Sequence, residues 1–127
     1  MMSPQFTPEE FEQLVVQALE DLPDFFKEKL QNVDVVIADW PTAAERQAVG
    51  LKPGQLLFGL YQGIPLTRRT SHYGLVLPDK ITIYRKPILQ VCRTPERIMR
   101  QVQHTVQHEL AHYFGISDDR LRELGAY

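Results

Sequence analysis

The segment from Thr94 to Gly115 carries both the start signal and the stop signal of one long helix, and this feature constrains the fold most strongly. Thr94 is a good N-cap, Pro95 suits the first helical position, and Glu96 lies in the positively polarised first turn. No proline or glycine interrupts the segment before Gly115, which ends it. We therefore expect a helix that continues to about Phe114.

A second helix is predicted near the start of the chain. Thr7, Pro8 and Glu10 form an N-cap, an N1 proline and the acidic end of a capping box. Apolar residues then follow at helical spacing: Phe11, Leu14, Val15, Ala18, Leu19 and Leu22. Pro23 ends this helix, and a shorter amphipathic piece is expected before Asn32.

Short apolar runs between turn residues predict β-strands in the middle of the chain. These runs are residues 33–38, 56–61, 81–84 and, more weakly, 75–77. The stretch 41–55 is typical of a loop, and Pro87 is expected to follow the end of the strand 81–84. Strands grouped between terminal helices predict an α+β fold, with a small mixed or antiparallel sheet packed by the N-terminal helix and the long C-terminal helix. The length suits a single domain, residues 1–127.

The composition excludes several classes of protein. With 43% hydrophobic and 24% charged residues, the chain is typical of a globular protein. The net charge of -2, with no run of basic residues, does not predict nucleic-acid binding. No apolar run is long enough to span a membrane and the start has no leader pattern, so we expect a cytoplasmic protein. The single cysteine, Cys92, leaves histidine and carboxylate side chains to hold any metal.

Residues 108–118 read HELAHYFGISD and carry the chemistry. His108 and His112 are four residues apart on a helix, so both imidazoles lie on one side and suit one zinc ion. Glu109 is offset by about 100°, which is the H-E-x-x-H arrangement with the glutamate as general base. Gly115 can reverse the chain and bring Asp118 back as a third ligand. Two histidines and an aspartate with one open position are typical of a catalytic zinc site.

Other interpretations of these residues stay open. Ser117 is a plausible N-cap of a short final helix. In that case Asp118 lies in the first turn, where its negative charge stabilises the positive end of the helix dipole, and Asp119 is the third metal ligand instead. His104 lies too far from His112 along the helix axis to share an ion with it, and it is expected to flank the site or to be exposed. His72 is expected at the surface, or else lining the cleft.

The sequence resembles the small bacterial zincin-like metallopeptidases. The resemblance extends from FEQLVVQALEDLP through VDVVIADWP, LLFGLYQGIPLTRR and LPDKITIYRKPIL to TVQHELAHYFGISDDRL. It implies a minimal zincin-like fold with His108, His112 and Asp118 as ligands of one Zn²⁺ and Glu109 as base. The motif HExxHxxGxxD is also similar to that of metzincins, but with 15 residues after His112 we expect no methionine turn.

The predicted function is hydrolysis of a peptide bond by a zinc metallopeptidase. The substrate, a peptide or an unfolded protein, is expected to lie extended along a sheet edge, either residues 56–61 or residues 81–84. The sequence offers four candidates for a second electrophile: Tyr61, Tyr73, Arg68 and Tyr113. Either activity is low, or a partner protein or a second copy of the chain completes the cleft.

Three alternatives remain at this stage. The first is a module that keeps the metal, is catalytically weak or inactive, and binds peptides or proteins. The second is a metal-dependent endoribonuclease, whose H-G-x-L-H signature differs from this chain at Glu109 and Asp118. The third is a non-haem iron oxygenase, since two histidines and a carboxylate also form its triad.

Overall fold

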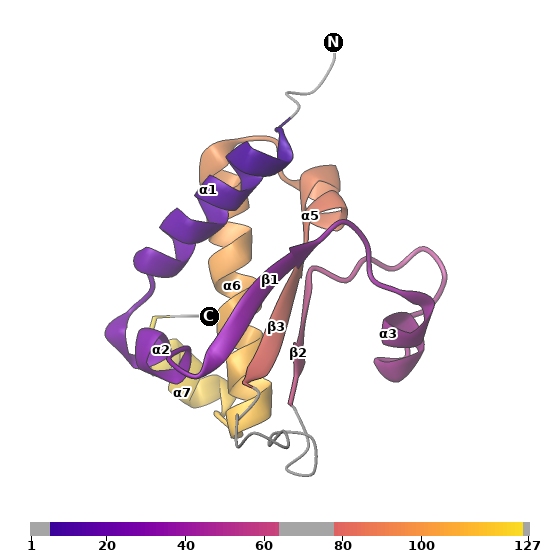
Figure 1. Ribbon diagram of the computed structural model, residues 1–127. Helices are drawn as coiled ribbons and strands as arrows, with labels where there is room; N and C mark the ends of the chain where they lie inside the picture. Colours follow the sequence, from indigo (N-terminus) through magenta and orange to yellow (C-terminus); the bar gives the residue numbers. More distant parts are fainter. Residues whose placement is uncertain (1–5, 64–77, 126–127) are drawn as a thin grey trace, which may run out of the picture.

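The structure is a computed structural model that describes residues 6–63 and 78–125. Within these residues the chain forms six helices and one three-stranded sheet, and α3 stands apart at one side of the sheet (Figure 1). The elements are α1 (Pro8–Glu20), α2 (Asp24–Lys29), β1 (Val33–Ala38), α3 (Ala43–Ala48), β2 (Gly59–Gln62), β3 (Asp79–Tyr84), α5 (Arg85–Val91), α6 (Pro95–Phe114) and α7 (Asp118–Glu123). The predicted α+β class is confirmed. No helix in the described ranges combines the length and the apolar character needed to cross a bilayer.

The sheet is mixed, with the strand order β1-β3-β2. β1 runs parallel to β3, with Val33 opposite Asp79, and β2 runs antiparallel to β3, with Gly59 opposite Ile83. Both sides of β3 are therefore paired. In the described part of the chain, β1 and β2 are the two edges of the sheet.

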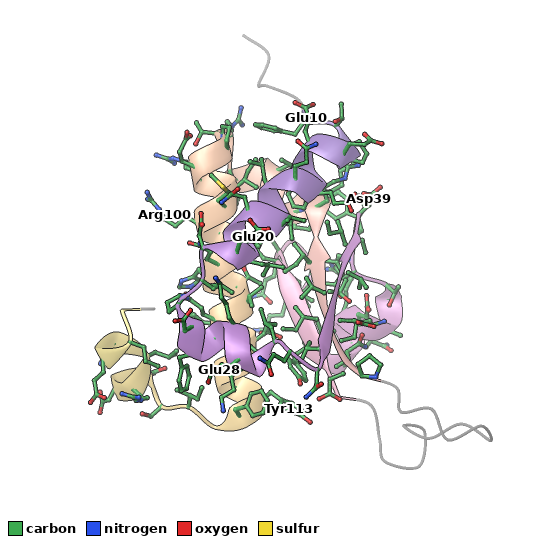
Figure 2. All side chains as sticks on the ribbon, turned by 60° about the vertical axis from the view of Figure 1, so that its left-hand side comes forward. Glu10, Glu20, Glu28, Asp39, Arg100 and Tyr113 are labelled. Atoms are coloured by element: carbon green, nitrogen blue, oxygen red, sulfur yellow. The ribbon has the colours of Figure 1, made fainter. Side chains whose placement is uncertain are left out.

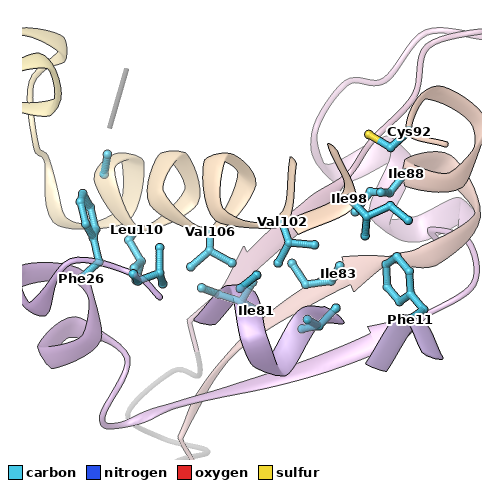
Figure 3. Close-up of a cluster of buried hydrophobic side chains, with 14 of the residues drawn as sticks. Phe11, Phe26, Ile81, Ile83, Ile88, Cys92, Ile98, Val102, Val106 and Leu110 are labelled. Atoms are coloured by element: carbon cyan, nitrogen blue, oxygen red, sulfur yellow. The ribbon is translucent and has the colours of Figure 1, made fainter. Parts of the chain in front are cut away.

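The hydrophobic core lies between one face of this sheet and the helices α1 and α6 (Figure 3). Side chains alternate along a strand, so Ile81 and Ile83 of β3 point to the same face. Val102, Val106 and Leu110 of α6 lie over them, and all five side chains are fully buried. Burying one such side chain stabilises the fold by roughly 1.5–3 kcal/mol. This packing fixes α6 beside the sheet.

The predicted start of α1 is confirmed in detail. The Thr7 amide donates to Oε1 of Glu10 (3.0 Å), and the Glu10 amide donates to Oγ1 of Thr7 (3.1 Å). These two bonds form the capping box. The shorter helix predicted between Pro23 and Asn32 is α2.

Two helices were not predicted. α3 lies in the stretch 41–55 and begins with a capping box of Thr42 and Glu45, but it has no buried residue and hence no apolar stripe in the sequence. α5 begins directly after β3, so Pro87 lies in its first turn, where the missing N–H of proline costs no helix bond. The third strand ends at Tyr84, as predicted, and the unpredicted feature is that Pro87 lies inside a helix.

The strand positions follow the predictions with shifted ends. β1 has the predicted bounds. β2 begins at Gly59 rather than at residue 56, and β3 begins at Asp79 rather than at residue 81. Pairing across the sheet, which local sequence does not encode, sets both starts. The weaker strand candidate at 75–77 lies outside the described residues.

Candidate metal centre

Both ends of α6 are fixed by the residues that predicted them. Oγ1 of Thr94 accepts a hydrogen bond from the Arg97 amide (3.2 Å), and Pro95 occupies the first turn. Gly115 has a left-handed backbone with φ of 68°, and its amide donates to the carbonyl of Ala111. A residue with a Cβ would be strained at this φ. The helix therefore stops at Phe114, less than one turn after the H-E-x-x-H residues.

The structure places His108, Glu109 and His112 together near the end of α6. The ring centroids of His108 and His112 are 6.4 Å apart and the ring planes are nearly perpendicular, at 85°. His104 lies one turn earlier, with its ring centroid 4.2 Å from that of His108. His104 and His112 are exposed, whereas His108 and Glu109 are half-buried. His104 thus flanks the candidate site, as predicted.

Glu109 is held at the open edge of β2. The Tyr61 amide donates a hydrogen bond to Oε1 of Glu109 (2.8 Å). The Tyr84 amide donates to the carbonyl of Phe58 (2.9 Å), so the backbone of Phe58 faces β3. Because backbone groups alternate in direction along an antiparallel strand, the Tyr61 amide points away from β3. The carboxylate therefore lies beside the unpaired edge of the sheet.

The surroundings of Glu109 and His108 shift the pKa values of both side chains. Burial raises the pKa of Glu109, and the Tyr61 N–H and the charge of His112 oppose this shift. Burial, followed by the neighbouring His104 and His112, lowers the pKa of His108, while Asp118 acts in the opposite direction. A raised carboxyl pKa suits a general base, and a neutral imidazole is the form that binds a metal.

Two glycines of β2 allow the close approach of α6. A Cβ on Gly59 would lie 2.5 Å from Cγ2 of Thr105, and a Cβ on Gly63, just after β2, would lie 3.1 Å from Cε2 of Tyr113. The Tyr61–Glu109 hydrogen bond lies between these two contacts. Two residues of strand and four residues of helix rise by similar lengths, about 6–7 Å. β2 and α6 therefore run side by side in the same direction, as Figure 1 shows.

Tyr61 has a structural role that the sequence did not reveal. Its ring stacks on that of Tyr113, with centroids 4.0 Å apart, and its hydroxyl donates to Oδ2 of Asp79 (2.6 Å). Figure 2 places Tyr113 at the end of α6 that carries the candidate site. Two other predicted electrophiles, Arg68 and Tyr73, lie outside the described residues. The glycines at 59 and 63 were the available sequence signal for this close packing.

The assignment of Asp118 as third ligand stays a prediction. Asp118 is the first residue of α7, and Oγ of Ser117 caps this helix by accepting from the Arg120 amide (3.1 Å). Oδ1 of Asp119 is 3.3 Å from Nη1 of Arg122. Across residues 6–63 and 78–125, no three His, Cys, Asp or Glu side chains are arranged to hold a metal ion. His72 lies outside these ranges.

The donor set nevertheless fits zinc in its chemistry. His108 and His112 stand one turn apart on one helix, and burial keeps His108 in the neutral form that zinc requires. Asp118 and Asp119, in the first turn of α7, have carboxylate oxygens, a type of donor that also binds zinc. His108 and His112 are the residues that would hold the ion.

The strand topology decides between the two predicted substrate edges. β3, which contains residues 81–84, is paired on both sides and cannot accept another strand. β2 is paired on one side only in the described structure, and it lies beside Glu109. Of the two predicted strands, β2 is thus the one that forms an edge of the sheet in the described residues and lies beside Glu109.

The comparisons with known proteins agree with this fold. The model of the zincin-like metallopeptidase family matches residues 30–126, so the chain belongs to this family. It is also similar to the solved structure of a conserved hypothetical protein from Thermo thermophilus. The two chains are 28% identical, the TM-score is 0.55, and the match covers 86% of this chain and 94% of the other. No curated protein matches the chain.

Proposed function

We propose that this chain is a zinc-dependent metallopeptidase. One Zn²⁺ is held by His108 and His112, with Asp118 as third ligand, and Glu109 is the general base. The observation that carries the proposal is the position of Glu109, which lies between two histidines on α6 and against the open edge of β2. A base, two nitrogen donors and a strand edge that can bind a peptide are thereby adjacent.

The residues of the chain divide the chemistry between them. Zinc, when bound, supplies a Lewis acid that lowers the pKa of water and polarises the carbonyl of the scissile bond. Glu109 removes a proton from water and returns it to the leaving amine. The raised pKa of Glu109 brings its proton affinity closer to neutral pH, where one group can serve as base and then as acid. The Tyr61 N–H keeps the carboxylate in place.

The proposed substrate is a cytoplasmic peptide or unfolded protein in extended form. The backbone groups of Gly59 that face away from β3 would pair with such a peptide, which then passes beside Glu109, whose carboxylate is held by the Tyr61 N–H. Binding through backbone groups selects extended chains over folded proteins, whose backbones are already paired.

Metal analysis of the purified protein tests this proposal, together with the digestion of a peptide library. We expect one zinc per chain and hydrolysis that stops with chelator and returns with zinc. In the double variant His108→Gln, His112→Gln we expect zinc to be absent. Asp118→Asn is expected to weaken zinc binding more than about tenfold, and the matched Asp119→Asn to leave it unchanged.

Two results would contradict the proposal. Stoichiometric zinc in the double histidine variant would place the metal elsewhere. Zinc-loaded protein that binds library peptides and cuts none would instead be a peptide-binding module.

A further inference from the structure

A groove of about 410 Å³ opens beside the candidate metal centre. It lies where the end of α5 meets the first half of α6, and no acidic side chain of the described residues lines it. Its lining consists of Val91, Cys92, Arg97, Arg100, Gln101 and His104. A groove with apolar and cationic walls suits an extended segment that carries negative charge.

The two arginines are available to a ligand. Arg97 and Arg100 are exposed, and neither forms an ion pair with any residue that the structure describes. Figure 2 shows Arg100 projecting outward from α6. Glu96, the acid next to Arg97 in sequence, is not part of the lining. Guanidinium groups of this kind bind carboxylates through paired hydrogen bonds.

One residue links the groove to the candidate metal centre. His104 lines the groove, and its ring lies against that of His108, with 4.2 Å between centroids. Arg97, Gln101, His104 and His108 succeed one another at spacings of three and four residues, so they follow one side of α6. The rise from Glu109 back to Arg100 is about 13 Å, which an extended peptide covers in about four residues.

The direction of β2 sets the direction of a bound peptide. The contacts of Gly59 with Thr105 and of Tyr61 with Glu109 show that β2 runs in the same direction as α6. Antiparallel pairing is the more stable kind, so a peptide on β2 runs from the end of α6 towards its start. The residues that follow the scissile bond then reach Arg100 and Arg97.

We infer that this groove binds acidic side chains of the substrate about four to six residues after the cleaved bond. This inference rests on the proposed peptidase function. It names the substrate class as extended peptides with carboxylates on the C-terminal side of the cut. The Val91 and Cys92 wall adds apolar contact to the stems of these side chains.

The test uses three short peptides with blocked ends and the same neutral filler residues. One carries glutamates in its C-terminal half, one carries them in its N-terminal half, and one has glutamine in their place. Binding to zinc-loaded Glu109→Gln protein is measured by fluorescence anisotropy at low salt. Cleavage by the wild type is mapped by mass spectrometry.

We expect the peptide with C-terminal glutamates to bind about tenfold or more tightly than the glutamine peptide. In an Arg97→Gln, Arg100→Gln background this preference is expected to disappear. The matched Lys27→Gln, Lys52→Gln background loses the same charge away from α6 and should keep the preference. The double variant Arg97→Glu, Arg100→Glu should instead prefer a peptide that carries lysines in place of the glutamates. Such binding would also show that this variant is folded.

The outcomes separate this inference from the proposed function. Equal binding of the three peptides, or a preference that survives in the arginine variants, would overturn the inference. So would cuts that leave the glutamates on the N-terminal side. Selective binding without any hydrolysis would support the groove and contradict the peptidase function. Hydrolysis without charge preference would support the peptidase function and overturn the inference.

Discussion

The two edges of the sheet differ in what lies beside them. β1 faces α1 across a groove of about 450 Å³ whose apolar lining includes Val15, Val35 and Val36. β2 faces α6, and its outward Tyr61 N–H bonds the carboxylate of Glu109. Of these two edges, only the second has a carboxylate and two imidazoles beside it.

This difference shows that the neighbouring helix, rather than the strand, gives an edge its chemistry. α1 and α6 both bury an apolar stripe against the same face of the sheet. Glu109 is adjacent in sequence to Leu110, which is fully buried in the core. The core contact and the chemical group are thus fixed by the same helical turn, because successive residues lie about 100° apart.

The largest expected effect comes from changing one carboxylate at each edge. Glu109→Gln at β2 is expected to reduce hydrolysis by about 10²–10⁴, because the variant has no general base. Asp39→Asn, next to β1, should change the rate less than about twofold, since Asp39 lies at the other edge of the sheet. Initial rates on the best library peptide measure both. Zinc content in Glu109→Gln should equal that of the wild type, and a rate that stays undiminished there would reject Glu109 as base.

The next effect concerns the packing of each edge. Gly59→Ala on β2 is expected to lower the free energy of unfolding by about 1–3 kcal/mol, because its Cβ meets Cγ2 of Thr105. Thr105→Ser removes that methyl group and should recover most of the loss in the double variant. Val36→Ala on β1, where the side chain is 39% exposed, should cost less than about 1 kcal/mol. Urea unfolding measures all of these. Equal losses at the two edges would show that β2 is not packed more tightly than β1.

The smallest effect is the pH dependence of the ion pair next to β1. Nε of Arg85 donates to Oδ1 of Asp39 (2.9 Å), and this bond lowers the pKa of Asp39. A depressed folded-state pKa adds stability above the unfolded value of about 3.9, and this stability is lost as pH falls through the folded value. The Tm difference between the wild type and Asp39→Asn should therefore be constant near neutral pH and shrink below about pH 4. A difference that grows on acidification would contradict this linkage.

The sequence predicts the elements whose signals are local. Both ends of α6 and the start of α1 follow from caps, prolines and Gly115, and the structure confirms them. α3 was missed because it buries no side chain, so no apolar stripe marks it. α5 was missed because it follows β3 without a turn. The capping box of Thr42 and Glu45 shows that capping residues carry information even where hydrophobic periodicity is absent, whereas α5 has no side-chain cap to mark its start.

In the candidate site, too, local sequence predicts some contacts, whereas others depend on residues far apart in the chain. Helical spacing alone brings His108, Glu109 and His112 together. The partner of Glu109 is 48 residues away in sequence, at the Tyr61 backbone, and no local pattern encodes it. The choice between the two substrate edges also required the pairing of β3 on both sides. Asp118 stays a prediction because the same residue suits a ligand and the first turn of α7.

The matched spacing of β2 and α6 has a consequence for recognising similar chains. Gly59 and Gly63 are four residues apart with Tyr61 between them, and they face Thr105 and Tyr113, which enclose the H-E-x-x-H residues. A search pattern can therefore join Gly-x-Tyr-x-Gly upstream to Thr-x-x-His-Glu-x-x-His-Tyr downstream. Insertions inside either stretch would move the Tyr61 amide away from the Glu109 carboxylate.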